Sequence, residues 1–194
     1  PTGVDGIANE ATITQDGAGG ASFVTQTGDN QVTITQGAGS SGMVAEVTQD
    51  NAGGGVSNTA EITQYGTGDG AYYGAALVQQ TGTEGEVEIT QEADTVDAVA
   101  AVIQSGNDSE VEIEQYGIGT QMNIFVTQNG DDNDVNVGQG DSDNASITIA
   151  QTGPDHFATV DQEYSPNSTL DITQSGTDNF ASVDEYQSAG SGIS

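Results

Sequence analysis

A five-residue pattern of alternating small or apolar and polar positions recurs along the chain. It consists of a small or apolar residue, a variable residue, Ile or Val, a second variable residue, and Gln. Fifteen copies are present, of which fourteen end in Gln and one ends in Glu. Alternation with a period of two, rich in β-branched residues, predicts β-strands that carry the small residue, the Ile or Val and the Gln on one face. A helix is excluded, because the period is wrong and Gly separates the segments.

The Gln that ends each copy is predicted to form amide ladders between stacked strands, as in cross-β structures. These ladder residues are Gln15, Gln26, Gln36, Gln49, Gln64, Gln80, Gln91, Gln104, Gln115, Gln128, Gln139, Gln151, Gln162 and Gln174. From Gln80 onward their spacing alternates between 11 residues and 12 or 13 residues. One turn of the chain therefore contains two strands: a strand, a tight turn, a second strand and a slightly longer turn.

A second column of residues distinguishes the two strands of each turn. Six residues before the end of the second strand, the chain has Asn9, Asn30, Asn58, Asn133 and Asn179, with Gly85, Ser109 and His156 at equivalent positions. These Asn side chains are predicted to add to the ladders. Two residues after a ladder Gln, Gly is predicted to provide the positive φ of a tight turn. The turn glycines are Gly17, Gly28, Gly66, Gly82, Gly106, Gly117, Gly130, Gly153 and Gly176.

These patterns predict an all-β fold, a two-sheet β-solenoid whose strand-turn-strand rungs have about 23 residues and stack into a cross-β fibre. Residues 1–8 are predicted to be a lead-in, 9–187 the solenoid of about seven rungs, and 188–194 a tail. The spacing between successive ladder Gln residues becomes longer over residues 50–75, where Gly-rich turns are expected. An uncapped end of such a solenoid exposes unpaired strand edges, and these are a template for the next molecule.

Charge and composition narrow the possible functions. The chain has no Lys or Arg and 30 Asp plus Glu, a formal charge of −30. Nucleic-acid binding is excluded, because it needs cationic side chains. Such a polar, charged composition favours disorder unless the repeat overrides it. No apolar run is long enough for a transmembrane helix, and no leader stands at Pro1, so any secretion signal is expected to have been removed.

The repeat resembles the curlin repeat, Ser-x5-Gln-x-Gly-x-Gly-Asn-x-Ala-x3-Gln. Residues 174–185 match it with Ser168 upstream, Asp178 at the second Gly and Glu185 at the last Gln. Residues 151–162 match with His156 at the Asn position, and the resemblance covers about residues 9–187. It implies a secreted structural subunit that polymerises with itself into extracellular amyloid fibres of the biofilm matrix, active in adhesion. It also implies two partners, a nucleator subunit and an outer-membrane secretion channel.

No enzyme activity, catalytic residue, cofactor or metal site is expected. His156, the single His, stands in the Asn column and is interpreted as a substitute for a ladder amide. The Asp-rich stretches 130–134 and 140–144 leave open weak, nonspecific binding of divalent cations. The alternative function is a soluble monomeric β-solenoid that binds ice, divalent cations or a surface receptor.

The outward positions differ between the two strands of a turn. Second strands carry Glu61, Glu88 and Glu112, which predicts an acidic stripe on one sheet. First strands carry Leu77 and Phe125, which predicts a partly apolar face on the other sheet, where fibres could bundle side by side.

Overall fold

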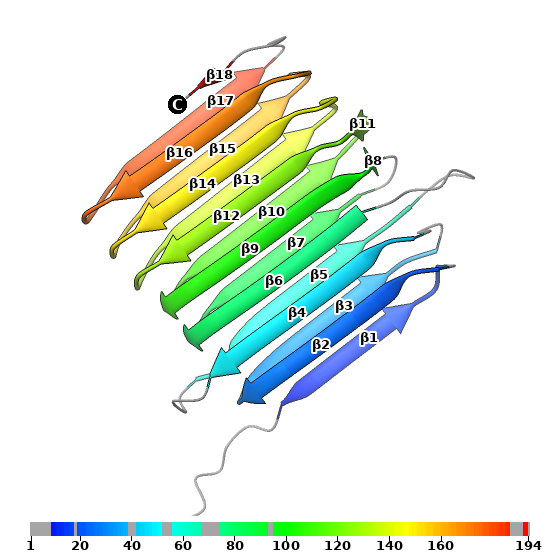
Figure 1. The fold of residues 1–194 in the computed structure, drawn as a ribbon, viewed down its shortest axis with the longest axis vertical. Coiled ribbons are helices and arrows are strands. Elements are labelled where there is room, and N and C mark those ends of the chain that lie inside the picture. The colour runs from blue at the N-terminus through cyan, green and yellow to red at the C-terminus, as the bar shows by residue number, and fades with distance from the viewer. Residues whose placement is uncertain are drawn as a thin grey trace, which may run out of the picture.

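The computed structural model describes residues 9–17, 19–38, 42–51, 56–66, 74–92, 95–186 and 192–193. These residues form eighteen β-strands and no helix, and the strands stack along the long axis of the molecule (Figure 1). The predicted lead-in 1–8, the Gly-rich insertion 53–55 and most of the tail 188–194 lie outside the described residues.

Two parallel sheets of eight strands each face one another, and a two-stranded sheet lies beside them. Sheet 1 contains, in order, β1 (Glu10–Gln15), β3 (Asn30–Gln36), β5 (Asn58–Gln64), β7 (Glu86–Gln91), β10 (Glu110–Tyr116), β13 (Asp134–Gly140), β15 (Phe157–Glu163) and β17 (Phe180–Tyr186). Sheet 2 contains β2 (Ala21–Gly28), β4 (Val44–Asn51), β6 (Gly74–Thr83), β9 (Ala98–Asn107), β12 (Asn123–Asn129), β14 (Ser146–Thr152), β16 (Thr169–Ser175) and β18 (Gly192–Ile193). The short strands β8 (Thr95–Val96) and β11 (Gly119–Thr120) pair in the longer turns.

The chain alternates between the sheets, so each turn adds one strand to each. Equivalent residues of successive turns are paired: Ile113 lies between Ile89 and Val137, and the Gln residues are aligned in the same way. The pairing offset is 24 or 23 residues from Gln91 onward. It rises to 28 and 31 residues across the segment that contains the loose spacing. The predicted β-solenoid is therefore confirmed.

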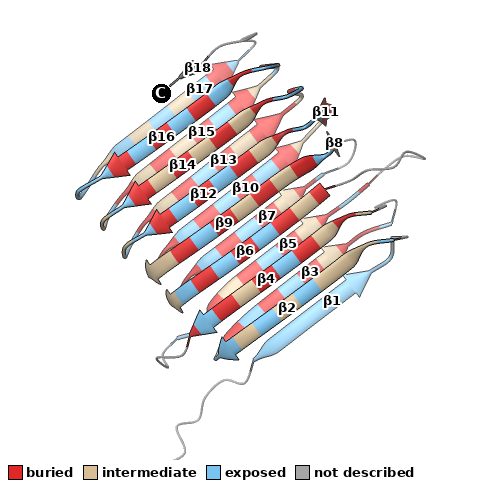
Figure 2. Ribbon diagram, in the orientation of Figure 1, coloured by how far each residue is buried: buried red, intermediate tan, exposed pale blue. Residues whose placement is uncertain are grey.

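Buried and exposed residues alternate along the strands of the central turns (Figure 2). The thin core between the sheets is built from the Ile, Val and Ala of each copy, including Ile62, Ile89 and Val126, which are almost fully buried. Every residue of β1 is exposed. The pattern predicts the inward face correctly, but in β1, which has a neighbouring strand on one side only among the described residues, that face is left exposed.

The tight turns depend on glycine for two reasons. Gly106 has φ +139° and Gly130 has φ +138°, conformations that other residues rarely adopt. In addition, a Cβ on Gly106 would stand 2.1 Å from the carbonyl oxygen of Gly130 in the next turn. Seven of the nine predicted turn glycines have positive φ, and the residues that follow Gly17 and Gly66 lie outside the described part of the chain.

A second residue with positive φ closes the tight turns from Gly82 onward, and the sequence pattern did not predict it. It is an acidic residue at Glu84, Asp108, Asp132, Asp155 and Asp178. Asp tolerates this conformation better than most residues, because its short side chain can hydrogen-bond locally. A recurrent Asp two residues after the turn Gly was the signal for it, at four of these five positions.

Candidate functional site

The ladder Gln residues hold the rungs together inside the solenoid. Gln91 Nε2 donates to Gln115 Oε1 at 2.8 Å, and Gln115 Nε2 donates to Gln139 Oε1 at 3.2 Å. In sheet 2, Gln104 Nε2 donates in the same way to Gln128 Oε1 at 3.0 Å. Each ladder continues from the first predicted Gln of its sheet, Gln15 or Gln26, to β17 or β16.

The second N–H of a ladder amide reaches across to the other sheet. Gln104 Nε2 donates to the carbonyl oxygens of Ser109 at 2.9 Å and Glu86 at 3.2 Å, which belong to two successive turns of sheet 1. Along the solenoid axis, each strand of sheet 2 thus lies at a height between those of two successive strands of sheet 1. Because a buried amide without partners is costly, these contacts fix the height of every rung.

The Asn column joins several turns at the start of the sheet 1 strands, but it is interrupted at Asn30, whose buried Oδ1 accepts no hydrogen bond from the described residues. The backbone N–H of Asn30 donates to Asn9 Oδ1 at 3.1 Å, and that of Gly85 donates to Asn58 Oδ1 at 3.0 Å. The column continues with His156, whose backbone N–H donates to Asn133 Oδ1 at 3.1 Å.

His156 provides both an acceptor and a donor, as an Asn side chain in this column can. Its Nδ1 lies 3.3 Å from the backbone N of Asn179 and its Nε2 lies 3.1 Å from the carbonyl oxygen of Thr152. A neutral ring with the proton on Nε2 fits both contacts, because Nδ1 then accepts and Nε2 donates. The side chain is buried.

Two buried serines form a further column that the sequence reasoning missed. Ser142 Oγ accepts from the backbone N–H of Ser165 at 3.0 Å, and both hydroxyls also donate to carbonyl oxygens of their own turn. Both serines stand three residues after a ladder Gln, in successive turns, and this fixed offset was the available signal.

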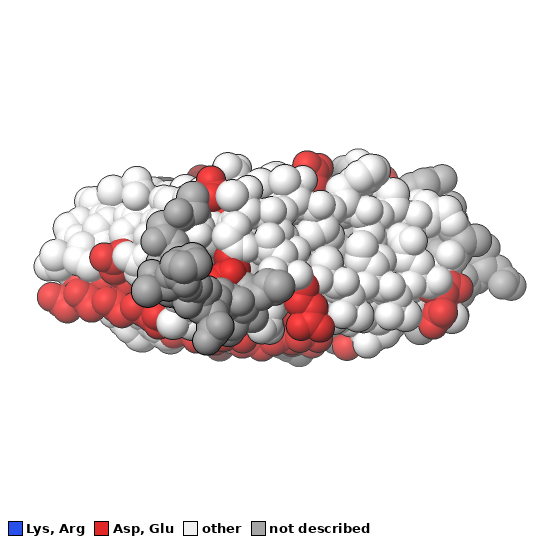
Figure 3. Space-filling model, turned by 90° about the horizontal axis from the view of Figure 1, so that it is seen from below, with Lys and Arg blue, Asp and Glu red and all other residues white. Residues whose placement is uncertain are grey.

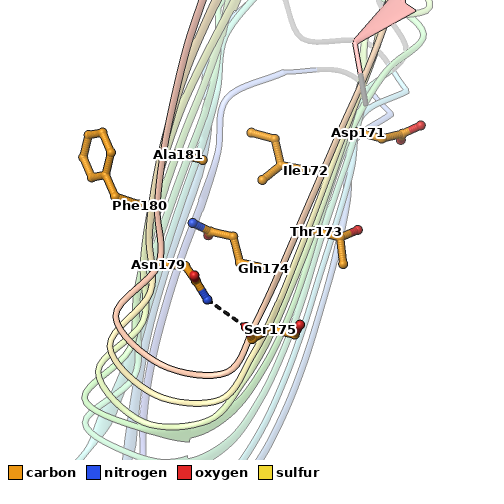
Figure 4. Close-up of a pocket in the computed structure, with 8 residues that line it drawn as sticks. All are labelled: Asp171, Ile172, Thr173, Gln174, Ser175, Asn179, Phe180 and Ala181. Atoms are coloured by element: carbon orange, nitrogen blue, oxygen red, sulfur yellow. Dashed lines mark hydrogen bonds between the residues drawn. The ribbon is translucent and has the colours of Figure 1, made fainter.

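At the C-terminal end of the solenoid, the described residues leave the core open. A hollow of about 450 Å³ lies between β16 and β17, where Ile172, Gln174 and Ala181 point into the space between the strands (Figure 4). Phe180 points away from this space and is 70% exposed, although its ring stacks on Phe157 at 5.3 Å. The hollow is the end of the core, left uncovered because no complete strand lies over β16 and β17 among the described residues.

Strand β18 begins to cover this end. Gly192 and Ile193 pair with Thr169 and Leu170, the first two residues of β16. Sheet 2 thereby gains its eighth strand, and both sheets contain the same number. At the opposite end, β1 and β2 are the last strands of their sheets, and the inward-facing Ile13 of β1 is 45% exposed.

Carboxylates gather over the outer face of sheet 1. Figure 3, seen from the end at which β1 lies, shows them along one side of the molecule. Glu88 is paired with Glu61 and Glu112 in the adjacent strands. Partial burial, together with the negative charges of these two neighbours, raises the pKa of Glu88 above its ordinary value. Burial and the neighbouring carboxylates Asp134 and Glu86 similarly raise the pKa of Glu110.

The outer face of sheet 2 carries the predicted apolar patch. Leu77, Ala101 and Phe125 are paired across β6, β9 and β12, and Ile103 lies beside them. Leu77, Phe125 and Ile103 are between 36% and 49% exposed. A shallow groove of about 260 Å³ crosses the patch.

Within the described residues, no group of three or more His, Asp or Glu side chains is placed to hold a metal ion. None of these residues belongs to a helix that is long and apolar enough to cross a membrane. No family model, curated protein or solved structure matches the chain.

Proposed function

We propose that the protein is the structural subunit of an extracellular curli-like fibre, in which molecules join end to end by β-strand pairing. The resemblance of the repeat to the curlin repeat supports this proposal, as do the rungs that the described residues leave uncovered at both ends. That resemblance also provides the proposed setting: a secreted subunit of a biofilm matrix, active in adhesion, with a nucleator subunit and an outer-membrane secretion channel as partners.

The observation that carries the proposal is the match between the two ends. If β1 of a second molecule covers β17 in the register that β17 has with β15, the inner face pairs Ala181 with Ala11 and Val183 with Ile13. On the outer face, Ser182 meets Thr12. The remaining pairs are Phe180 with Glu10, Asp184 with Thr14, and Glu185 with Gln15.

This register brings no two carboxylates together, although the chain carries 30 of them. Inside sheet 1 such pairs are common, for example Glu88 with Glu112 and Asp161 with Asp184. Like charges directly opposite each other destabilise a sheet. The order of the strands also fits. Along the solenoid axis the strands alternate between the two sheets, and the last two are β17 of sheet 1 and β18 of sheet 2. A strand of sheet 1 comes next, and β1 of a second molecule is such a strand.

The test is the growth of the purified chain with a charge placed on either face of β1. Ile13→Asp puts a carboxylate on the inner face, which the next molecule would bury, whereas Thr12→Asp puts the same charge on the outer face of the same strand. We expect fibres with a cross-β repeat from the wild type and from Thr12→Asp, observed by electron microscopy and fibre diffraction, and none from Ile13→Asp.

Both positions are exposed in the single molecule, so circular dichroism should show the same β-structure in both variants. A wild-type chain that stays monomeric under all conditions would favour the alternative, a monomeric solenoid that binds ice, divalent cations or a receptor.

A further inference from the structure

Both Gln ladders have the same direction. Every described ladder contact has Nε2 of one turn donating to the acceptor oxygen of the following turn, from Gln15 to Gln36 at 2.6 Å in sheet 1 to Gln151 and Gln174 at 2.9 Å in sheet 2. Gln15 Nε2 also donates to Ser22 Oγ at 3.1 Å. Since the amide nitrogen of Gln15 is directed toward the second turn, its Oε1 is the atom presented to any rung added before β1.

The ladder of sheet 1 ends in a carboxylate. Glu185 Oε2 accepts from Gln162 Nε2 at 3.3 Å, and the side chain is 4% exposed. An ionised carboxylate accepts hydrogen bonds but has none to donate. Glu185 therefore continues the ladder on the side of β15 and does not supply the N–H that every Gln in the column supplies to the next turn.

We propose that Glu185 and Gln15 of a second copy of the chain form a mismatched contact that slows end-to-end growth. This inference rests on the proposed function. In the register of the junction, the carboxylate of Glu185 meets Gln15 Oε1, which places two acceptors together. Turning the Gln15 amide over does not remove the mismatch, because its oxygen then faces Gln36 Oε1 within the same molecule.

The mismatch is confined to one position of the sheet 1 contact. The other inner pairs, Ala181 with Ala11 and Val183 with Ile13, repeat the small and β-branched pairs found inside the solenoid. The Asn column also continues, because Asn179 precedes β17 as Asn9 precedes β1. A subunit whose rungs fold readily within one chain is thereby slowed at the step that joins two chains.

The test is a double-mutant cycle on position 15 in β1 and position 185 in β17, two strands that lie at opposite ends of one molecule (Figure 1). Glu185→Gln restores a donor at the end of the ladder. Gln15→Lys places an ammonium group, with three donors, between Gln36 Oε1 and the carboxylate of the neighbouring molecule. Asp184→Asn is the matched control, because it removes the same charge from the outer face of the same strand. Elongation is measured from seeds of the same variant.

Glu185→Gln should speed elongation by about fivefold or more, because the new amide donates a hydrogen bond to Gln15 Oε1 of the next molecule, an acceptor that is buried at the junction. Gln15→Lys should speed it similarly in the wild-type background but not in the Glu185→Gln background. Asp184→Asn should change it less than about twofold. Because residues 15 and 185 meet only between molecules, unfolding of the monomer should show no coupling between them.

Fibres that elongate equally fast with and without Glu185→Gln, and without coupling to position 15, would overturn this inference and leave the proposed function intact. If none of the variants forms fibres, both fail.

Discussion

Strands β1 and β5 have nearly the same pentad, yet opposite environments. Residues 11–15 read Ala-Thr-Ile-Thr-Gln and residues 60–64 read Ala-Glu-Ile-Thr-Gln. Ile13 is 45% exposed, whereas Ile62 is fully buried. The difference comes from neighbours, because β5 lies between β3 and β7 while β1 has a partner on one side only. A strand at the end of the described solenoid therefore keeps its inward face exposed until another rung covers it.

The largest expected effect is the difference between the two isoleucines. Ile62→Ala should lower the free energy of unfolding by about 2–5 kcal/mol, because it leaves a cavity in a closed core. Ile13→Ala should lower it by less than about 1 kcal/mol, since the side chain is half exposed. Urea unfolding of the folded monomer measures both. Equal losses would show that the end rung is already closed in the single molecule.

The turn glycines provide a second matched pair. Gly130 and Gly176 both have positive φ, +138° and +101°. A Cβ on Gly130 would lie 2.3 Å from the carbonyl oxygen of Gly153, whereas on Gly176 the nearest atom would be 4.0 Å away. Replacing either by Ala imposes backbone strain of about 1–3 kcal/mol. Gly130→Ala should cost clearly more in thermal unfolding, because the turn above must also move. A cost at Gly176 as large as that at Gly130 would contradict this account.

Removing a ladder amide should have a smaller effect that depends again on position. Gln115→Leu leaves Gln91 Nε2 and Gln139 Oε1 without their ladder partner inside the core, at a cost of about 1–3 kcal/mol for each group. Gln15→Leu removes a donor from Gln36 and from Ser22, in an end strand whose residues are all exposed to water. Chemical denaturation should therefore show a loss at Gln115 at least twice that at Gln15. A reversed order would mean that the ladders do not set the height of the rungs.

The repeat was sufficient to predict the strands, their inward faces and the pairing of Gln with Gln, because alternation and spacing are local properties of the chain. The direction of the ladders was not predictable. An amide can present either its oxygen or its nitrogen to the next turn, and the carbonyl groups of the opposite sheet, such as those of Glu86 and Ser109 around Gln104, determine which. The role proposed for Glu185 follows only from that direction, although its place in the column was visible in the sequence.

The central rungs also differ from the ends in what they present sideways. Leu77 and Phe125 lie on the outer face of β6 and β12, in the middle of sheet 2. If this patch joins fibres side by side, replacing both with Ser should give thinner bundles in electron micrographs while elongation stays within about twofold of the wild type. Replacing the exposed Thr12 and Ser182 of the end strands with Ala serves as the control and should leave bundle width unchanged. Bundles of unchanged width from the double Ser variant would argue against the patch.

The smallest expected effect is a pH dependence that arises in the central rungs. Glu88 belongs to a column of outward-facing residues that are paired from strand to strand across sheet 1. This column has Thr12 and Thr33 at one end and Thr159 and Ser182 at the other, so paired carboxylates occur only in its middle.

The pKa of Glu88 is raised above its ordinary value of 4.5 by partial burial and by Glu61 and Glu112. A raised pKa in the folded state means that its contribution to stability is fully present below pH 4.5 and is lost as the pH rises through the raised value. Glu88→Gln should therefore flatten the loss of stability as the pH rises above 4.5, by a few tenths of a kcal/mol as for a solvent-exposed pair. Thr33→Gln, in the same column but beside a single carboxylate, should leave the pH profile of thermal unfolding as it is in the wild type. If Thr33→Gln flattens the profile as much as Glu88→Gln, the pH dependence does not come from the stacked carboxylates.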